Sequence, residues 1–454
     1  MKIHRHRILA PATLLAATLA GCSSTPPDYE KGPRDAVSAV GDTLNPPEDA
    51  QGTPALKPVS PANEYMRFAL LRHPQVRAAF QEWRASVEAI TPAHALPDPR
   101  LTFEADVSNT LMTLMPGIMF DFMGPGKREA MGREAAAGSE VLYRAYLSTL
   151  LATAGEVRKA WIDLAYAGEA LDLRRKSVAL ADQSVSVAQA DYATGAGMAS
   201  LEKQTNLLNQ IARLKADAAT MEDRLVAARA RFKAALGLRR DEADPPWPAG
   251  AFPAVPAADD ETLWRRLSEA NPRLASMRAM VAMATASAKV ADKAGTPDYS
   301  LGVMTDLKPN PIMVRPTASM TLPVWRDKID AVIATAEARR LAAEARLNSE
   351  EISLAAELAQ TLVMVREAER MAGFLDNTAI PNTGRALASA EAGYQSGMGG
   401  FSTLAELRLM ELDLRLERAA ARRQRETSLA DLALLVADTI PSDGLTAAET
   451  SSTK

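Results

Sequence analysis

The chain is poor in the residues that build disulfides, metal centres and catalytic sites. Its 454 residues include one cysteine, Cys22, and four histidines, of which only His73 and His94 lie beyond the first 21 residues. Both stand close to prolines at predicted helix ends, which favours structural roles over metal binding. No His-Glu-x-x-His, paired-cysteine or Gly-x-Ser-x-Gly pattern is present. The sequence therefore gives no support for an enzyme, a cofactor or a bound metal.

The chain also lacks an excess of positive charge and any long apolar run. A formal net charge of -4, with no basic patch interleaved with aromatic residues, argues against a nucleic-acid partner. No apolar run reaches the length of about 18 residues that a transmembrane helix needs. The apolar stretch Ile8–Leu19 is shorter and follows Lys2, Arg5 and Arg7. Residues 1–21 are therefore interpreted as a secretory signal peptide.

Cys22 follows Leu19, Ala20 and Gly21, an order that resembles the bacterial lipobox, in which the cysteine is acylated and becomes the mature N-terminus. The alternative is an incidental small residue in a leader. By the same resemblance, Ser23 favours delivery to the outer membrane. Residues 22–62 are rich in Pro, Ser, Thr, Asp and Gly, so we expect a lipidated segment without regular helix, either an extended tether or a strap lying on the body.

Proline is absent between Pro125 and Pro245, and apolar residues there recur at alternating spacings of four and three. This step keeps one helix face toward a partner helix. It holds on an outgoing arm (Tyr143, Leu147, Leu150, Ala154, Val157, Trp161, Leu164, Gly168, Leu171) and on a returning arm (Leu207, Ile211, Leu214, Ala218, Met221, Leu225, Ala228, Phe232, Ala235). Gly195 and Gly197 mark the reversal between them. The pattern predicts a coiled-coil hairpin about 100 Å long.

Before the hairpin the apolar period changes from that of a helix to that of a strand. Leu101–Ser108 alternates apolar and polar residues at every step, and Ile118–Phe122 does so again. We expect helices from Asn63 to Ala95, with a break at His73-Pro74, and then these two strands.

The second half of the chain repeats this plan about 200 residues later. Asn271-Pro272, Pro297-Asp298 and Tyr394–Gly397 correspond to His73-Pro74, Pro97-Asp98 and Tyr192–Gly195. The sequence predicts a first repeat at 63–240 (strands about 99–122, hairpin 127–237), a Pro-rich linker at 241–258, a second repeat at 259–438 (strands about 298–323, hairpin 326–437) and a disordered tail at 439–454. Pro381 has no counterpart in the first repeat and should kink or split the second long helix.

Each repeat thus offers two strands long enough to cross a bilayer when tilted. Four strands cannot close a barrel, and open edges are not tolerated in lipid, whereas three copies would give twelve strands. Leu101, Phe103, Ile118 and Phe120 would then face lipid, and the polar positions would face a lumen. A small sheet packed on helices in a soluble protein also alternates and is the alternative.

The predicted lumen would carry carboxylates at Glu104, Asp106, Asp121 and Asp306. In three chains they would form acidic rings that favour cations. The alternative is that they are simply solvated side chains on the water-facing wall of the lumen. Methionines at positions 112, 115, 119 and 123 are a soft-ligand cluster that could assist Cu(I), although filler is the favoured interpretation.

The duplicated order of helix, two strands and long hairpin, with the Pro-Asp and Tyr-x-x-Gly motifs in each copy, resembles the TolC-like outer-membrane efflux protein family over about residues 63–438. The resemblance implies a homotrimer whose transmembrane β-barrel continues into a periplasmic α-helical barrel. It also implies that Pro381 lies near the equatorial break of the helices. The implied contacts of the periplasmic adaptor and the inner-membrane transporter are the tips, at Gly195, Ala196, Gly197, Gly397, Met398, Gly399 and Gly400.

The sequence therefore predicts a mainly α-helical protein with a small transmembrane β part. Its expected function is the exit channel of a tripartite (RND-type) efflux system for metal cations or small toxic compounds, anchored in the outer membrane. Two alternatives remain open: a non-conducting periplasmic coiled-coil lipoprotein, and the outer-membrane channel of a type I protein secretion system.

Overall fold

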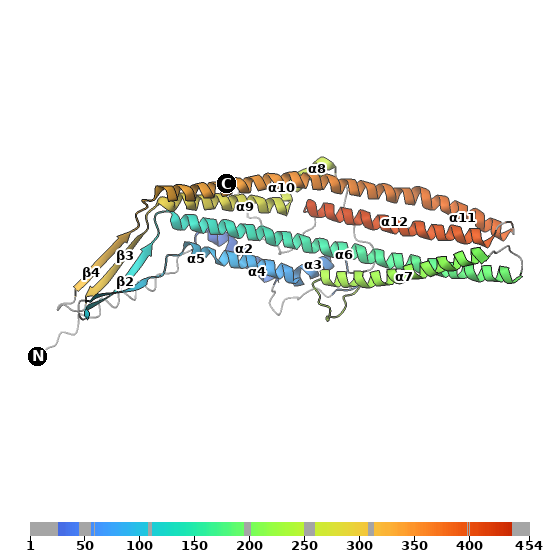
Figure 1. Ribbon diagram of the computed structural model, residues 1–454, viewed down its shortest axis with the longest axis horizontal. Coiled ribbons are helices and arrows are strands. Elements are labelled where there is room, and N and C mark those ends of the chain that lie inside the picture. The colour runs from blue at the N-terminus through green and yellow to red at the C-terminus, as the bar shows by residue number, and fades with distance from the viewer. Residues whose placement is uncertain are drawn as a thin grey trace.

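The chain forms a long helical bundle with a four-stranded sheet at one end (Figure 1). A computed structural model describes residues 26–44, 56–58, 60–107, 111–194, 201–248, 259–306, 313–396, 398 and 400–437. The leader, Cys22, the predicted tail and the tip residues Gly195–Gly197 lie outside these ranges. The mainly helical fold with a small strand part, as the sequence predicts, is confirmed.

The two repeats contain corresponding elements in the same order. The first comprises α3 (Ala62–Arg72), α4 (Pro74–Glu88), α5 (Ile90–His94), β1 (Arg100–Val107), β2 (Leu111–Phe122), α6 (Lys127–Thr194) and α7 (Leu201–Ala235). The second comprises α8 (Asp260–Ala270), α9 (Pro272–Ala291), the 3-10 turn η1 (Asp292–Gly295), β3 (Tyr299–Asp306), β4 (Met313–Met320), α10 (Arg326–Phe374), the π-helical turn η2 (Leu375–Ala379), α11 (Ile380–Gln395) and α12 (Phe401–Leu435).

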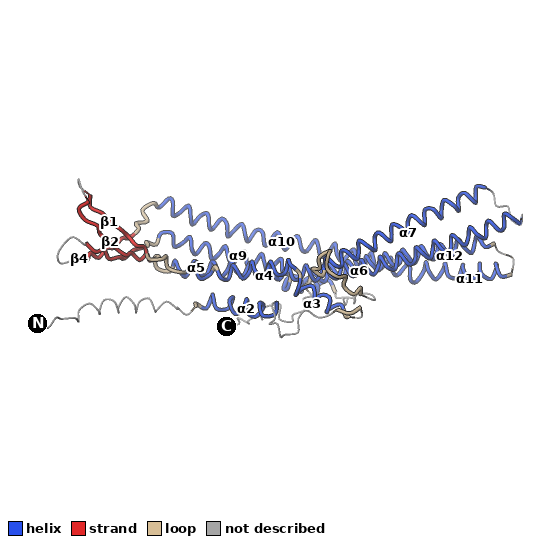
Figure 2. Tube along the Cα trace, turned by 90° about the horizontal axis from the view of Figure 1, so that it is seen from below, coloured by secondary structure: helices blue, strands red, loops and turns tan. Residues whose placement is uncertain are grey.

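Helix α6 is the spine of the bundle. Its 68 residues, at about 1.5 Å each, extend for about 100 Å and contact α3, α4, α5, α7, α9 and α12. The positions predicted for its apolar face are buried at Leu150, Ala154, Val157 and Trp161. The spacing of four and three therefore reports the packing of this helix correctly. Toward the tips, α7 diverges from α11 and α12 (Figure 2).

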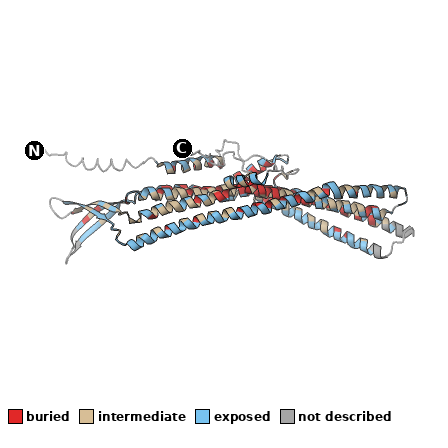
Figure 3. Cartoon of the chain, turned by 90° about the horizontal axis from the view of Figure 1, so that it is seen from above, coloured by how far each residue is buried: buried red, intermediate tan, exposed pale blue. Residues whose placement is uncertain are grey.

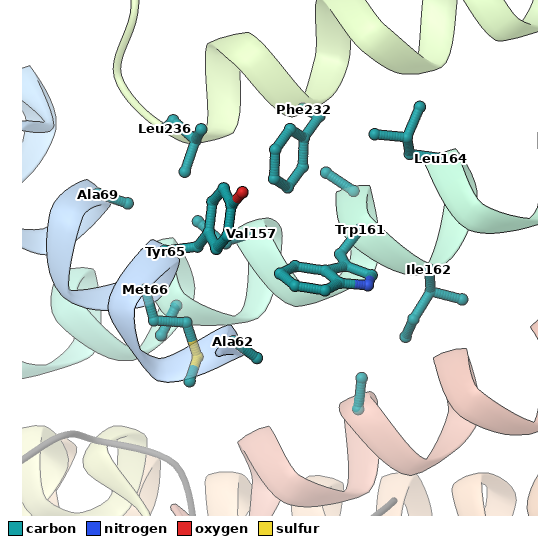
Figure 4. Close-up of a cluster of buried hydrophobic side chains, with 13 residues drawn as sticks. Ala62, Tyr65, Met66, Ala69, Val157, Trp161, Ile162, Leu164, Phe232 and Leu236 are labelled. Carbon is teal, nitrogen blue, oxygen red and sulfur yellow. The ribbon is translucent and has the colours of Figure 1, made fainter. Parts of the chain in front are cut away.

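An aromatic cluster joins three elements halfway along the bundle. Tyr65 of α3 packs edge-on against Trp161 of α6, with ring centroids 5.1 Å apart, and Phe232 of α7 closes the group (Figure 4). The Tyr65 hydroxyl donates a hydrogen bond to the Pro246 carbonyl at 2.9 Å, so its polar end is satisfied inside the cluster. Buried residues concentrate in this middle part of the bundle (Figure 3).

The His-Pro and Asn-Pro motifs mark places where two helices meet end to end. Asn271 accepts hydrogen bonds from the backbone amides of Arg273 and Leu274 through Oδ1, and so caps α9. Its Nδ2 donates to the Leu435 carbonyl at the end of α12, at 2.8 Å. His73 caps α4, and the left-handed Gly237 packs directly against its Cα. Asn271 therefore caps the start of α9 and also binds the end of α12.

The helix change expected at Pro381 is present, because α10 gives way to the π-helical turn η2 just before it. A π turn bonds each amide five residues back, so it tolerates the missing proline donor. The π turn does not lie where the helices meet end to end, which is where an equatorial break would be expected. Those junctions are at Gly237 and Leu435. Asp376 in η2 pairs with Arg418, so the turn lies between the Leu435 junction and the tips.

The expectation that residues 22–62 contain no regular helix is wrong. Helix α2 spans Asp28–Leu44 with Pro33 inside it, and it lies against α4 and α6. Val37, Val40 and Leu44, spaced by three and four, are buried in a shared core. Burying three apolar side chains stabilises the helix by several kcal/mol, more than the roughly 3 kcal/mol that an interior proline costs.

A buried carboxylate fastens α2 to the base of the sheet. Glu30 forms an ion pair with Arg34 at 2.8 Å and a hydrogen bond with His94 at 2.7 Å, and it accepts a hydrogen bond from Thr91. The Tyr29 ring packs edge-on against His94. Burial alone would raise the pKa of Glu30, but the hydrogen bonds from Thr91, His94 and Arg34 outweigh it and lower this pKa to about 2.

Replacing Asn271 with alanine should lower stability by about 1–2 kcal/mol, because the N-cap of α9 and the bond to Leu435 are both lost. The measurement is the thermal midpoint of helical circular dichroism in detergent. Exposed Asn63→Ala is the matched control. Equal midpoints for the two variants would contradict the dual capping role.

Replacing Glu30 with glutamine should release α2 in a pH-dependent way. The folded pKa of Glu30 lies below its usual 4.5, so its contribution, on the order of 2–3 kcal/mol, is present above pH 4.5 and is lost as pH falls through about 2. Deuterium exchange of α2 amides, compared with wild type at the same pH, should be about 30-fold faster or more at pH 7. At pH 3 the difference should fall to about tenfold. A ratio independent of pH, or the same effect from exposed Glu169→Gln, would refute this role.

Candidate functional site

The four strands form one antiparallel sheet in the order β1-β2-β3-β4, so the two repeats meet at its centre. The register pairs Leu101 with Ile118 between β1 and β2, and Asp121 with Ser300 between β2 and β3. Within the single chain, β1 and β4 are the edge strands. The sheet follows the helical bundle at the end away from the tips (Figure 1).

Strand β2 begins earlier than the sequence predicts, at Leu111 instead of Ile118. The prediction stopped there because Pro116 and Gly117 weaken a strand pattern. In the structure, Pro116 lies opposite Phe103, and pairing with β3 begins only at Gly117. The proline therefore lies just beyond the part of β2 that is paired on both sides. Pro316 occupies the corresponding position of β4.

One face of the sheet is apolar. Directly paired residues of an antiparallel sheet point to the same side, and successive residues alternate. The register places on this face Leu101, Phe103, Ile118, Phe120, Tyr299, Leu301, Val303 and Val314. Leu101 and Phe103 are 68% and 64% exposed, which is unusual for side chains of this size.

The opposite face carries three of the four carboxylates that the sequence predicts for a lumen, Glu104, Asp121 and Asp306. The fourth, Asp106, is paired with Thr113 in the register. The face also holds Ser300, Thr317 and Ser319. The sheet therefore has one apolar side and one side that carries its charged residues.

Two arginines that sequence reasoning overlooked neutralise part of this charge. Arg100 forms a two-pronged ion pair with Asp121, with both N···O distances 2.8 Å, and the Ser300 hydroxyl donates to the same carboxylate. Arg315 lies 3.4 Å from Asp306. Glu104 is exposed. The alternation could have revealed both arginines, since each is an even number of residues from a predicted polar position.

Methionines are also concentrated on the polar face. Met115 and Met119 of the predicted cluster lie there and are joined by Met304 and Met313 from the second repeat. The side chain of Met304 lies over Gly117, where an added Cβ would stand 2.6 Å from the Met304 Cγ. Glycine at position 117 thus makes room for this side chain. No cluster of three or more His, Cys, Asp or Glu side chains able to hold a metal is found in the described residues.

The two repeats are fastened together where the strands join the helices. Asp298 accepts a hydrogen bond from the Gly124 amide at 2.7 Å and pairs with Lys127 at 2.9 Å. Gly124 is tightly enclosed, because a Cβ there would stand 2.4 Å from the Pro297 carbonyl oxygen. Asp98, the counterpart of Asp298 in the first repeat, is exposed.

The predicted adaptor-contacting tips are only partly within the described residues. Gly195, Ala196, Gly197, Gly397 and Gly399 lie outside them. Met398 is 86% exposed, and Gly400 precedes α12 as its N-cap. Nearby, the Tyr394 ring packs against Phe401 with centroids 5.9 Å apart, which joins the ends of α11 and α12.

None of the helices in the described parts of the chain combines the length and the apolar character of a membrane-spanning helix.

Comparison with known proteins gives a family and a fold. Residues 263–438 match the family model described as outer membrane efflux protein. No curated protein matches in a sequence search. Solved structures with the same fold include the CmeC outer membrane channel of Campylobacter jejuni, with a TM-score of 0.70 and 11% identity, which covers 89% of this chain and 92% of that one.

Two further channels are similar. MtrE of Neisseria gonorrhoeae has a TM-score of 0.69 and 16% identity, covering 88% of this chain and 95% of that chain. VceC of Vibrio cholerae has a TM-score of 0.65 and 16% identity, covering 82% and 94%. The outer membrane efflux protein model thus matches the second repeat in sequence, and the fold over both repeats is that of these solved outer-membrane proteins.

Proposed function

We propose that three copies of this chain form the outer-membrane exit channel of a tripartite (RND-type) efflux system that exports metal cations or small toxic compounds. The observation that carries this proposal is the division of the sheet into two faces. An apolar face that is exposed over Leu101, Phe103 and Leu301 suits lipid, and a face with Glu104, Asp121 and Arg100 suits water.

Closure by three copies follows from the two unpaired edges. In hydrocarbon, each unpaired backbone amide or carbonyl costs several kcal/mol, so β1 and β4 must find partners. Four strands from each of three chains give twelve, an even number within the range of known barrels.

The helical part supports the same assembly. Helix α6 is covered by neighbours along its length, whereas α10 exposes large apolar side chains. Leu341, Ile352 and Val363 are all more than half exposed, and Trp325 stands at the foot of α10. These positions suit contact with the helices of a neighbouring copy, which would extend the barrel as a helical tube into the periplasm.

The partners are proposed on the same basis. A periplasmic adaptor and an inner-membrane transporter would meet the tips at Gly195–Gly197 and Gly397–Gly400, and Cys22 would hold an acyl anchor in the outer membrane. Helix α2 is consistent with a strap that runs from that anchor along the bundle, because Glu30 fixes its first turn close to the base of the sheet.

The protein should produce discrete conductance steps in planar bilayers and a β-type circular dichroism signal that resists heating in detergent. A bracing lipoprotein that does not conduct would give neither. A deletion strain that lacks this protein should become sensitive to metals or drugs, and the set of proteins that it secretes should be unchanged. A depleted secretome with normal resistance would instead indicate the protein-secretion alternative.

The charge distribution on the polar face predicts opposite effects for two neutralising substitutions. Glu104→Gln removes an exposed anion and should lower the preference for cations. Arg100→Gln frees Asp121 from its ion pair and should raise that preference. The measurement is the reversal potential under a KCl gradient. Exposed Glu169→Gln on α6, away from the sheet, is the control. Unchanged selectivity in both variants would exclude a luminal position for this face.

A further inference from the structure

The two repeats share one strand register, residue for residue. Leu101 pairs with Ile118 in the first repeat, and Leu301 pairs with Ala318 in the second, each 200 positions later. Phe103 opposite Pro116 and Val303 opposite Pro316 follow the same rule. The sheet is thus two copies of one β-hairpin, and the β2–β3 pairing shows how the end of one hairpin joins the start of the next.

The joint inside the chain has two components. The first is the register, in which Asp121 lies opposite Ser300, and Gly117 lies opposite Met304. The second is the ion pair that Asp298, just before β3, forms with Lys127, the first residue of α6. Both components join a strand pair to the pair that follows it.

We infer that β4 pairs with β1 of the next copy in this same register, which places Ser319 opposite Thr102 and Thr317 opposite Glu104 of that copy. This inference rests on the three-copy channel proposed above. Subtracting or adding the repeat length of 200 residues converts the observed pairs Met119–Gly302 and Gly117–Met304 into these two. The conversion keeps every polar position on the polar face.

The ion pair inside the chain has no counterpart in this register. Asp98 corresponds to Asp298, but the position 200 residues after Lys127 is Asp327, which is also a carboxylate. The bond between Asp298 and Lys127 therefore belongs to the joint inside the chain only.

The close backbone contact at Gly124 also has no counterpart in the joint between copies. Val324 stands where Gly124 stands in the first repeat, and Gly124 is enclosed so closely that any Cβ would meet the Pro297 carbonyl oxygen at 2.4 Å. A valine cannot approach a neighbouring backbone in this way. The joint between copies therefore depends on strand pairing, without the backbone hydrogen bond that Gly124 gives to Asp298.

Other registers would have distinct consequences. A slip by one residue would turn the apolar face of β1 toward water. A slip by two would keep the faces but place Thr102 opposite Thr317. Directly paired residues can form a disulfide, whereas diagonal neighbours about 7–8 Å apart cannot without backbone movement. Disulfide trapping can therefore distinguish the registers.

The test compares two double-cysteine variants in native outer membranes. Thr102→Cys with Ser319→Cys represents the inferred register, and Thr102→Cys with Thr317→Cys represents the slip by two. Wild type controls for Cys22, the only natural cysteine. On oxidation and non-reducing electrophoresis, the first variant should give covalent dimers and trimers, with at least tenfold less from the second.

The outcomes separate this inference from the proposed function. A trimer in detergent by light scattering, with cross-linking only in the slipped pair or in neither, would overturn the register and leave the channel standing. A monomer would overturn both.

Discussion

Backbone hydrogen bonding without water is the constraint on which this structure depends. A sheet can enter hydrocarbon only if every strand is paired on both sides. Four strands arranged as β1-β2-β3-β4 leave two edges open in each chain, so a chain built for lipid is incomplete alone. The same incompleteness is visible in the helices, where α10 leaves Ile352 and Trp325 exposed while α6 buries its apolar stripe inside the chain. In the assembly proposed above, neighbouring copies would complete the backbone hydrogen bonds of the sheet and cover these apolar side chains of the bundle.

The shorter helices of the bundle are joined end to end by contacts of single residues. Helices α4 and α7 lie end to end along α6, and α9 and α12 meet in the same way, so each long helix faces two shorter ones. The joints are fixed by single residues, Asn271 and Gly237, and the Tyr65–Trp161–Phe232 cluster lies close to one of them. Most of the large buried side chains lie away from the tips, so the tips depend on local contacts such as that between Tyr394 and Phe401.

The sequence correctly predicts features that follow from the spacing of apolar residues along the chain. It does not predict contacts between segments that are distant in the sequence. Alternation by two places Leu101 and Glu104 on opposite faces, and the step of four and three identifies the buried face of α6. Helix α2 was missed because Pro33 interrupts the helical pattern ahead of an apolar stripe of only three residues. In addition, Glu30 is held by Thr91 and His94, more than 60 positions away. The pairing of Arg100 with Asp121 likewise requires a strand register that no local pattern reveals.

The duplication explains both the likeness of the two hairpins and their one clear difference. Position 181 of α6 is a fully buried alanine that packs beside Ile211 and Leu214, whereas its counterpart at position 381 is a proline preceded by a π turn. Alanine allows a continuous 68-residue helix, but proline at the same place removes an amide donor and requires a wider turn. Arg418 of α12 pairs with Asp376 at this turn and so holds the altered helix against its partner. A tube of three such chains would therefore alternate continuous and interrupted hairpins around its periplasmic end, with threefold instead of sixfold symmetry there.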